Sequence, residues 1–195
     1  MILPIVAYGD PVLRQKAKEI PSEYPDLKEL VENMFETMYA ASGVGLAAPQ
    51  IGKAIRVFIL DTAPFSEDEE FTEEERELMK DFKKAFINAE ILQEEGEEWP
   101  FGEGCLSIPG INEDVFRQPD ITIKYEDTER KVHTEKFTGL IARVIQHEYD
   151  HIEGILFTDK LSSLKKRILK SKLKNISKGK VDADYRMRFP DKKGR

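Results

Sequence analysis

Residues 146–151 read QHEYDH and lie inside an apolar helical pattern, which leaves few folds open to this chain. Apolar residues recur at three- and four-residue intervals, as on one face of an amphipathic helix, at Leu140, Ile141, Val144, Ile145 and Ile152. Thr138 has a side chain of the type that caps helices, and Gly154 is a good helix terminator. The pattern therefore predicts a helix that carries His147 and His151 and packs its apolar face on the rest of the protein.

The rest of the chain predicts a sheet for this helix to pack against. Residues 27–39 show a second amphipathic helical pattern, which ends near Ser42. Strand patterns occur at residues 55–61, 85–92, 121–127 and 131–137. The last two alternate apolar and polar residues around a turn, which indicates a hairpin. This order predicts an α+β fold, in which a mostly antiparallel sheet packs around the QHEYDH helix and a C-terminal helix follows.

We expect a single domain, residues 1–195, because no internal repeat or linker interrupts the chain and its hydrophobic content is 40%. Its core is expected to span about residues 5–164, followed by a basic helix and tail over about residues 160–195. The tail after Gly179 is polar and is expected to be loose. We expect neither a signal peptide nor a membrane span, because no apolar run is long enough.

Charge and cysteine content narrow the function. The single cysteine, Cys105, cannot form an internal disulfide, so we expect a reducing, cytoplasmic compartment. The net charge of −7 argues against general affinity for DNA. Residues 66–81 are strongly acidic and residues 160–180 strongly basic, and both patterns are typical of solvated surfaces. For the basic stretch, contact with a polyanion such as ribosomal RNA stays open.

The two histidines are spaced to bind one cation. Residues four apart in a helix lie on the same face, so His147 and His151 can converge on a single metal ion. Glu148 lies beside this face, where it suits a group that contacts a metal-bound water. The alternative is that the histidines pack or cap, while Glu148 and Asp150 face solvent.

The third ligand decides the class of metal site. A metzincin protease would need a histidine where this chain has Phe157, and no glutamate follows Glu153 to replace it. The remaining donors are His133, which we expect on a strand surface, and Cys105. Cys105 lies in EGCLSIPG, whose glycines allow close backbone approach to a ligand and whose Ser107 and proline argue against regular structure. From these residues alone, a buried structural thiol stays open for Cys105.

Three segments together resemble bacterial peptide deformylases: GVGLAAPQ at residues 43–50, EGCLS at 103–107, and QHEYDH. The resemblance covers about residues 5–164. It implies that Cys105 joins the two histidines as the third metal ligand, with Fe²⁺ as the ion in the cell and Zn²⁺, Ni²⁺ or Co²⁺ as other candidates. It also implies the activity: removal of the formyl group from the N-terminal N-formylmethionine of newly synthesised proteins, with release of formate.

The resemblance further implies roles at the reacting centre. Glu148 would act as general acid/base on a metal-bound water that attacks the formyl group. The Gln50 side chain and the Leu106 backbone N–H would stabilise the oxyanion. Backbone groups of Val44 and Gly45 would bind the substrate. For Gln50, the alternative is a loop residue that hydrogen-bonds its own turn.

Leu140 and Val144 extend the histidine face towards the helix N-terminus, at intervals of four and three residues. They could form the floor of a pocket for the methionine side chain. Ordinary core packing is the alternative from the pattern alone.

The chain departs from the family pattern in two places. The acidic insertion is longer than a typical connection and could hold a short helix over residues 72–82, and Ala89 stands where a proline is common. The basic C-terminal helix resembles the part with which bacterial deformylases approach the ribosome. Three rival functions stay open: a metal-dependent amidase or peptidase acting on unformylated substrates, a structural Cys–His–His domain, and a decayed homologue.

Overall fold

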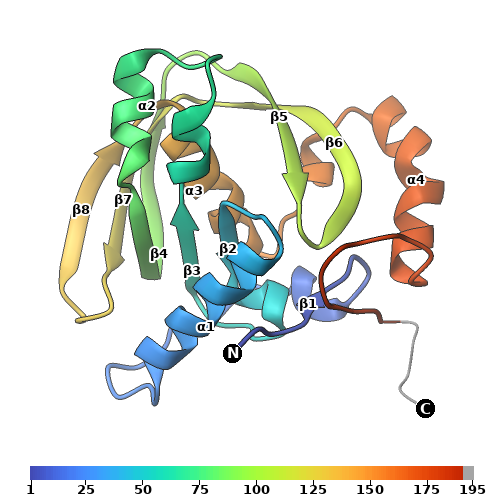
Figure 1. The fold of residues 1–195 in the computed structure, drawn as a ribbon, viewed down its shortest axis with the longest axis horizontal. Coiled ribbons are helices and arrows are strands. Elements are labelled where there is room, and N and C mark those ends of the chain that lie inside the picture. Colours follow the sequence, from blue (N-terminus) through green and yellow to red (C-terminus); the bar gives the residue numbers. More distant parts are fainter. Residues whose placement is uncertain (191–195) are drawn as a thin grey trace.

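The computed structural model describes residues 1–190, and its centre is a five-stranded sheet in the order β2-β3-β4-β7-β8. Every neighbouring pair in this sheet is antiparallel. Its strands are β2 (Gly45–Ala47), β3 (Val57–Asp61), β4 (Lys83–Glu95), β7 (Asp120–Glu126) and β8 (Val132–Phe137). The predicted α+β class and the predicted hairpin are thus confirmed (Figure 1).

Two helices cover opposite faces of this sheet, and β3 shows why. Successive strand residues point to opposite faces, so Val57 and Ile59 join the cluster packed on α1 (Leu27–Ala40), while Phe58 and Leu60 join the cluster packed on α3 (Gly139–Ile152). Because both faces are buried, the strand is continuously apolar instead of alternating. This packing holds α3, the helix that carries QHEYDH, against β2, β3 and β7.

A second hairpin lies beside the sheet, between α3 and the C-terminal helix (Figure 1). It consists of β5 (Trp99–Cys105) and β6 (Ile108–Arg117), which form a two-stranded antiparallel sheet. The expectation of irregular structure around EGCLSIPG was wrong, because Cys105 is the last residue of β5 and Ile108 the first of β6. Only Leu106 and Ser107 form the turn between them.

The C-terminal region also differs from the prediction. The basic helix α4 (Ser163–Ser177) is present, and the Ser162 side chain caps it. The chain then loops back, and β9 (Met187–Arg188) pairs in parallel with β1 (Ile5–Val6) (Figure 1). The tail is therefore not loose throughout, because Met187–Arg188 add a strand to the N-terminal segment; residues 191–195 lie outside the described part.

The remaining elements are short. The acidic insertion holds the expected helix, α2 (Glu73–Lys80), with a capping box between Thr72 and Glu75. Thr138 precedes α3 as expected, but its side chain makes no capping hydrogen bond. The 3₁₀ helices are η1 (Pro11–Arg14), η2 (Ala48–Ile51), η3 (Ala63–Glu67) and η4 (Phe157–Lys160). Within residues 1–190, none of the helices has the length and apolar character that crossing a membrane requires.

Candidate functional site

Cys105, His147 and His151 converge at one point where the end of β5 meets α3. One ligand atom from each lies within 4.8 Å of the other two, and the Cys105 Sγ is 3.3 Å from the His151 Nε2. In the part of the chain that the structure describes, this is the one such group of potential metal ligands. A thiolate and two imidazoles suit a divalent transition metal, and three protein donors leave a coordination position for a reactant. The donor set therefore fits a catalytic metal ion.

The other two candidate positions, His133 and Phe157, supply no ligand to this group. His133 is on β8, where its Nε2 lies 2.7 Å from an Asp127 carboxylate oxygen. Phe157, at the position where a metzincin would have its third histidine, is buried and stacks on the His147 ring with centroids 6.0 Å apart. It supports the ligand helix by packing.

A buried ionic network orients His147. The His147 Nδ1 lies 2.9 Å from a Glu103 carboxylate oxygen. Arg117 donates to both Glu103 oxygens, at 2.6 and 2.9 Å, and to Asp150 at 2.7 Å. Arg143 donates to Glu103 at 3.1 Å. Because the Nδ1–H of His147 faces this carboxylate, its Nε2 is left for the metal position.

The network keeps Glu103 ionised. Burial alone would raise the pKa of the Glu103 carboxyl, but hydrogen bonds from His147 and Arg117 outweigh it and hold that pKa well below its usual range. This network was not predicted from the sequence. Glu103 belongs to the EGCLS motif and could have been found there, whereas Arg117 carries no local signal of its partners in β5 and α3.

Glu148 lies at the site with one carboxylate oxygen unpaired. Its Oε2 is buried and has no hydrogen-bond partner among residues 1–190. Burial raises the pKa of this carboxyl to about 7, opposed by the nearby His147 and reinforced by Glu103. A β-carbon on Gly45 would lie only 2.8 Å from the Glu148 Cδ, so a larger residue at position 45 would displace the Glu148 carboxylate.

Gln50 has both contacts that the sequence suggested: it hydrogen-bonds its own turn, and its amide group faces the metal ligands. Its Oε1 accepts a hydrogen bond from the Ala47 N–H at 2.8 Å, which ties the side chain to its own turn. Its Nε2 is thereby directed to the metal-ligand side, 3.5 Å from the Cys105 Sγ and 3.3 Å from the Ser107 Oγ. The turn fixes the side chain, and the amide N–H groups face the site.

A cavity of about 690 Å³ opens onto these groups. Most of the predicted site residues line it, namely Val44, Gly45, Gln50, Cys105, Leu106, Leu140, Val144, His147 and Glu148. His151 is the exception, being buried behind the other ligands. Residues not foreseen also line the cavity: Phe65 from η3, Phe101 from β5, and Asp182 to Tyr185 from the tail.

Comparison with known proteins agrees with this geometry. The family model described as Polypeptide deformylase matches residues 2–167. The peptide deformylase of Christiangramia forsetii is 65% identical over 193 residues, covering 99% of this chain and 98% of the relative, and that of Flavobacterium johnsoniae is 62% identical over 196 residues, covering all of both chains. The crystal structure of peptide deformylase from Thermus thermophilus has a TM-score of 0.78 at 38% identity, covering 92% of this chain and 99% of that one.

Proposed function

Because the chain belongs to the polypeptide deformylase family, we propose that it hydrolyses the formyl amide of N-formylmethionine at the start of newly made polypeptides. The products would be formate and a free amino terminus. The observation that carries the proposal is the convergence of Cys105, His147 and His151 beside a buried carboxylate, Glu148, that has an unpaired oxygen.

Cys105, His147 and His151 would hold one divalent metal ion, Fe²⁺ in the cell, with Zn²⁺, Ni²⁺ or Co²⁺ as substitutes. When bound, such an ion supplies Lewis acidity, which polarises the formyl oxygen and lowers the pKa of a water molecule. Glu103 would keep His147 in the tautomer that this binding needs.

Glu148 would move the proton. A carboxyl whose pKa lies near the working pH can both accept a proton from water and return it to the leaving nitrogen. Its close contact with Gly45 would hold the carboxylate in place between α3 and β2.

Gln50 and Leu106 would stabilise the oxyanion that forms on the formyl oxygen. The Gln50 Nε2 is directed at the site because its Oε1 is already tied to Ala47. The Leu106 backbone N–H follows Cys105 directly in the turn. Loss of one such donor costs about 3 kcal/mol of transition-state stabilisation in comparable sites.

The substrate would bind as an added strand. β2 is an edge strand of the five-stranded sheet, so backbone groups of Val44 and Gly45 can pair with an extended peptide. Leu140 and Val144, which line the cavity, would then receive the methionine side chain.

The test is formate release from formyl-Met-Ala, measured anaerobically with Fe-, Ni- and Zn-loaded protein. We expect Glu148→Ala to retain its metal and to lose turnover by about 10²–10⁴-fold, which is the usual contribution of a general acid/base. Full activity in Glu148→Ala would contradict the role of Glu148. Cleavage of unformylated peptides without formate release would favour the rival amidase.

The proposal also includes a contact between α4 and the ribosome. Such a contact would place the reaction in the cytoplasm. Lys166, Lys170 and Lys174 repeat at four-residue intervals along α4 and line a groove of about 410 Å³. Phosphate contacts by such lysines would make binding salt-dependent. We therefore expect cosedimentation with ribosomes at low salt, lost at high salt and in Lys166→Glu/Lys170→Glu; association that salt does not change would contradict it.

A further inference from the structure

After α4, the C-terminal segment loops back towards the N-terminal segment (Figure 1). Residues 182–185 line the cavity, and β9 then pairs with β1. This segment lies beyond residue 167, where the match to the family model ends. The family match therefore does not cover the contacts of this segment.

The turn between β5 and β6 is held from three directions. The Tyr185 hydroxyl donates to the Leu106 carbonyl at 2.7 Å. The Tyr8 backbone N–H donates to the Ser107 carbonyl at 2.8 Å, and the Gln50 Nε2 lies 3.3 Å from the Ser107 Oγ. Tyr8 follows β1 by two residues and Tyr185 precedes β9 by two, so the β1–β9 pair delivers two of the three contacts.

Leu106 has little freedom within this turn. A β-carbon on Gly43 would lie 2.7 Å from the Leu106 Cδ1, so the Leu106 side chain rests directly on that glycine. Its carbonyl is held by Tyr185, whose ring is half-buried against the cluster that α1 forms with the sheet.

We propose that Tyr185 is a positioning residue for the reaction. By bonding the Leu106 carbonyl, it fixes the turn that presents the Leu106 N–H to the formyl oxygen. This inference rests on the proposed function, because the Leu106 N–H acts on an oxyanion only if the chain hydrolyses formyl amides. Oxyanion donors act through their placement, so a small displacement of this turn would lower kcat.

The test is Tyr185→Phe in the full-length, metal-loaded enzyme, because this change removes the hydroxyl and keeps the ring. Loss of one hydrogen bond corresponds to about a 3–10-fold effect. We expect kcat for formyl-Met-Ala to fall by that factor, with KM and metal content unchanged. The matched control is Tyr125→Phe on β7, which also removes a hydrogen-bonded hydroxyl but lies outside the cavity lining, and it should leave kcat unchanged.

Amide hydrogen exchange at Leu106, Ser107 and Ile108 separates this inference from the proposed function. We expect exchange at these amides to become several-fold faster in Tyr185→Phe and to stay unchanged in Tyr125→Phe. Unchanged exchange, or a wild-type kcat in Tyr185→Phe, would show that the hydroxyl only anchors the tail and would overturn the inference. Failure of the wild type to release formate would refute the proposed function and the catalytic role of Tyr185 with it, and the exchange rates would still show whether Tyr185 holds the turn.

Discussion

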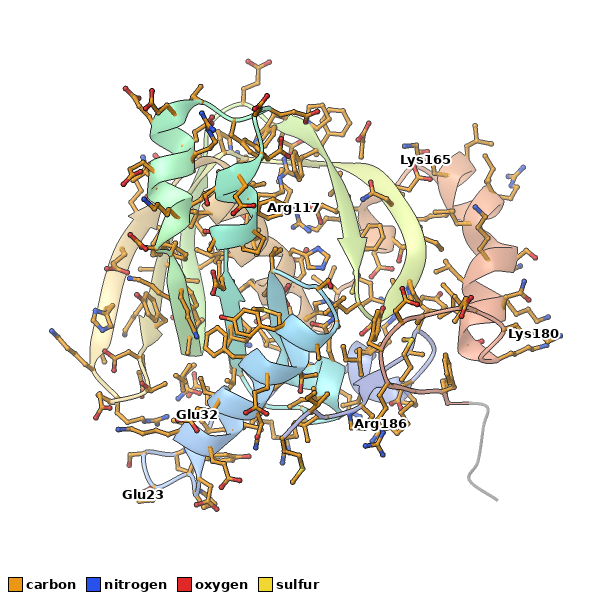
Figure 2. The ribbon with its side chains drawn as sticks, in the orientation of Figure 1. Glu23, Glu32, Arg117, Lys165, Lys180 and Arg186 are labelled. Atoms are coloured by element: carbon orange, nitrogen blue, oxygen red, sulfur yellow. The ribbon has the colours of Figure 1, made fainter. Side chains whose placement is uncertain are left out.

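The two C-terminal helices, α3 and α4, have nearly the same length but opposite relations to the protein interior. α3 has ten buried residues in 14, and five of them are polar or charged. α4 has three buried residues in 15, all apolar. In Figure 2, Arg117, a partner of the α3 network, lies within the molecule, whereas Lys165 on α4 and Lys180 just beyond it lie at the periphery. The buried polar residues of α3 are thus fixed by their contacts inside the protein, whereas the polar residues of α4 are in contact with solvent.

The β5–β6 hairpin shows the same contrast in two carboxylates. Glu103 and Glu113 are register partners across the two strands. Glu103 is buried and contacts Arg117, Arg143 and His147. Glu113 instead forms an ion pair with Lys165 of α4, at 2.7 Å, near the surface. The two carboxylates occupy paired positions, but we expect only the ion pairs of Glu103 to affect the free energy of unfolding strongly, because only Glu103 is buried.

The largest expected effect comes from Glu103→Ala. It would leave the buried charge of Arg143 without a carboxylate partner and that of Arg117 with Asp150 alone, and breaking a buried pair costs about 3–5 kcal/mol. We expect that loss in the free energy of unfolding, measured with urea, together with a metal affinity about 10–100-fold weaker. The control, Glu113→Ala, should leave both quantities close to wild type. Equal losses in the two variants would show that burial does not distinguish the contribution of Glu103 from that of Glu113.

The next effect concerns the face of α3 that lines the cavity. Val144→Phe should fill the space proposed for methionine, because Val144 is both packed in the core and part of the cavity lining. We expect the ratio of kcat/KM for formyl-Met-Ala to that for formyl-Ala-Ala to fall about 10–100-fold. Ile141→Phe, on the same helix but outside the cavity lining, should leave the ratio unchanged. An unchanged ratio in folded Val144→Phe would mean that the residue serves core packing alone.

The sequence patterns predicted those elements whose signal lies within a few neighbouring residues. The period of α3 and the four-residue histidine spacing identified the helix and two of the converging groups, and the strand patterns identified most of the central sheet. Cys105 came from the family resemblance, since no spacing relates it to the helix. Its neighbourhood was expected to be irregular because it contains two glycines and a proline. These residues form a regular hairpin because each strand pairs with the other, and this pairing cannot be read from either strand alone.

The features that sequence reasoning missed depend on distant partners. Tyr185 bonds a residue 79 positions away, and Arg117 bonds one 33 positions away. Neither pairing leaves a periodic signal. β9 was predicted as loose tail because two residues are too few to show alternation, and its order comes from pairing with β1.

A smaller effect is expected in the pH dependence of stability. The pKa of Glu103 is held below its ordinary value of 4.5 in the folded protein, so its contribution is fully present above that value and is lost as the pH falls below it. This one group changes the free energy of unfolding by at most about 1.4 kcal/mol per pH unit. In urea unfolding from about pH 5 to about pH 3, the decline should be steeper for wild type than for Glu103→Gln. Equal slopes would show that the network does not hold this pKa down.

The smallest effect is expected on α4. Ile168 is 66% exposed, so Ile168→Lys removes no buried contact and adds one more solvated charge to a basic helix. Substitutions at such positions usually change the free energy of unfolding by less than about 0.5 kcal/mol, and kcat should equal that of wild type. Thermal unfolding and formate release would measure both. A clear fall in kcat would show that α4 is coupled to the catalytic groups through its contacts with the β5–β6 hairpin and the tail.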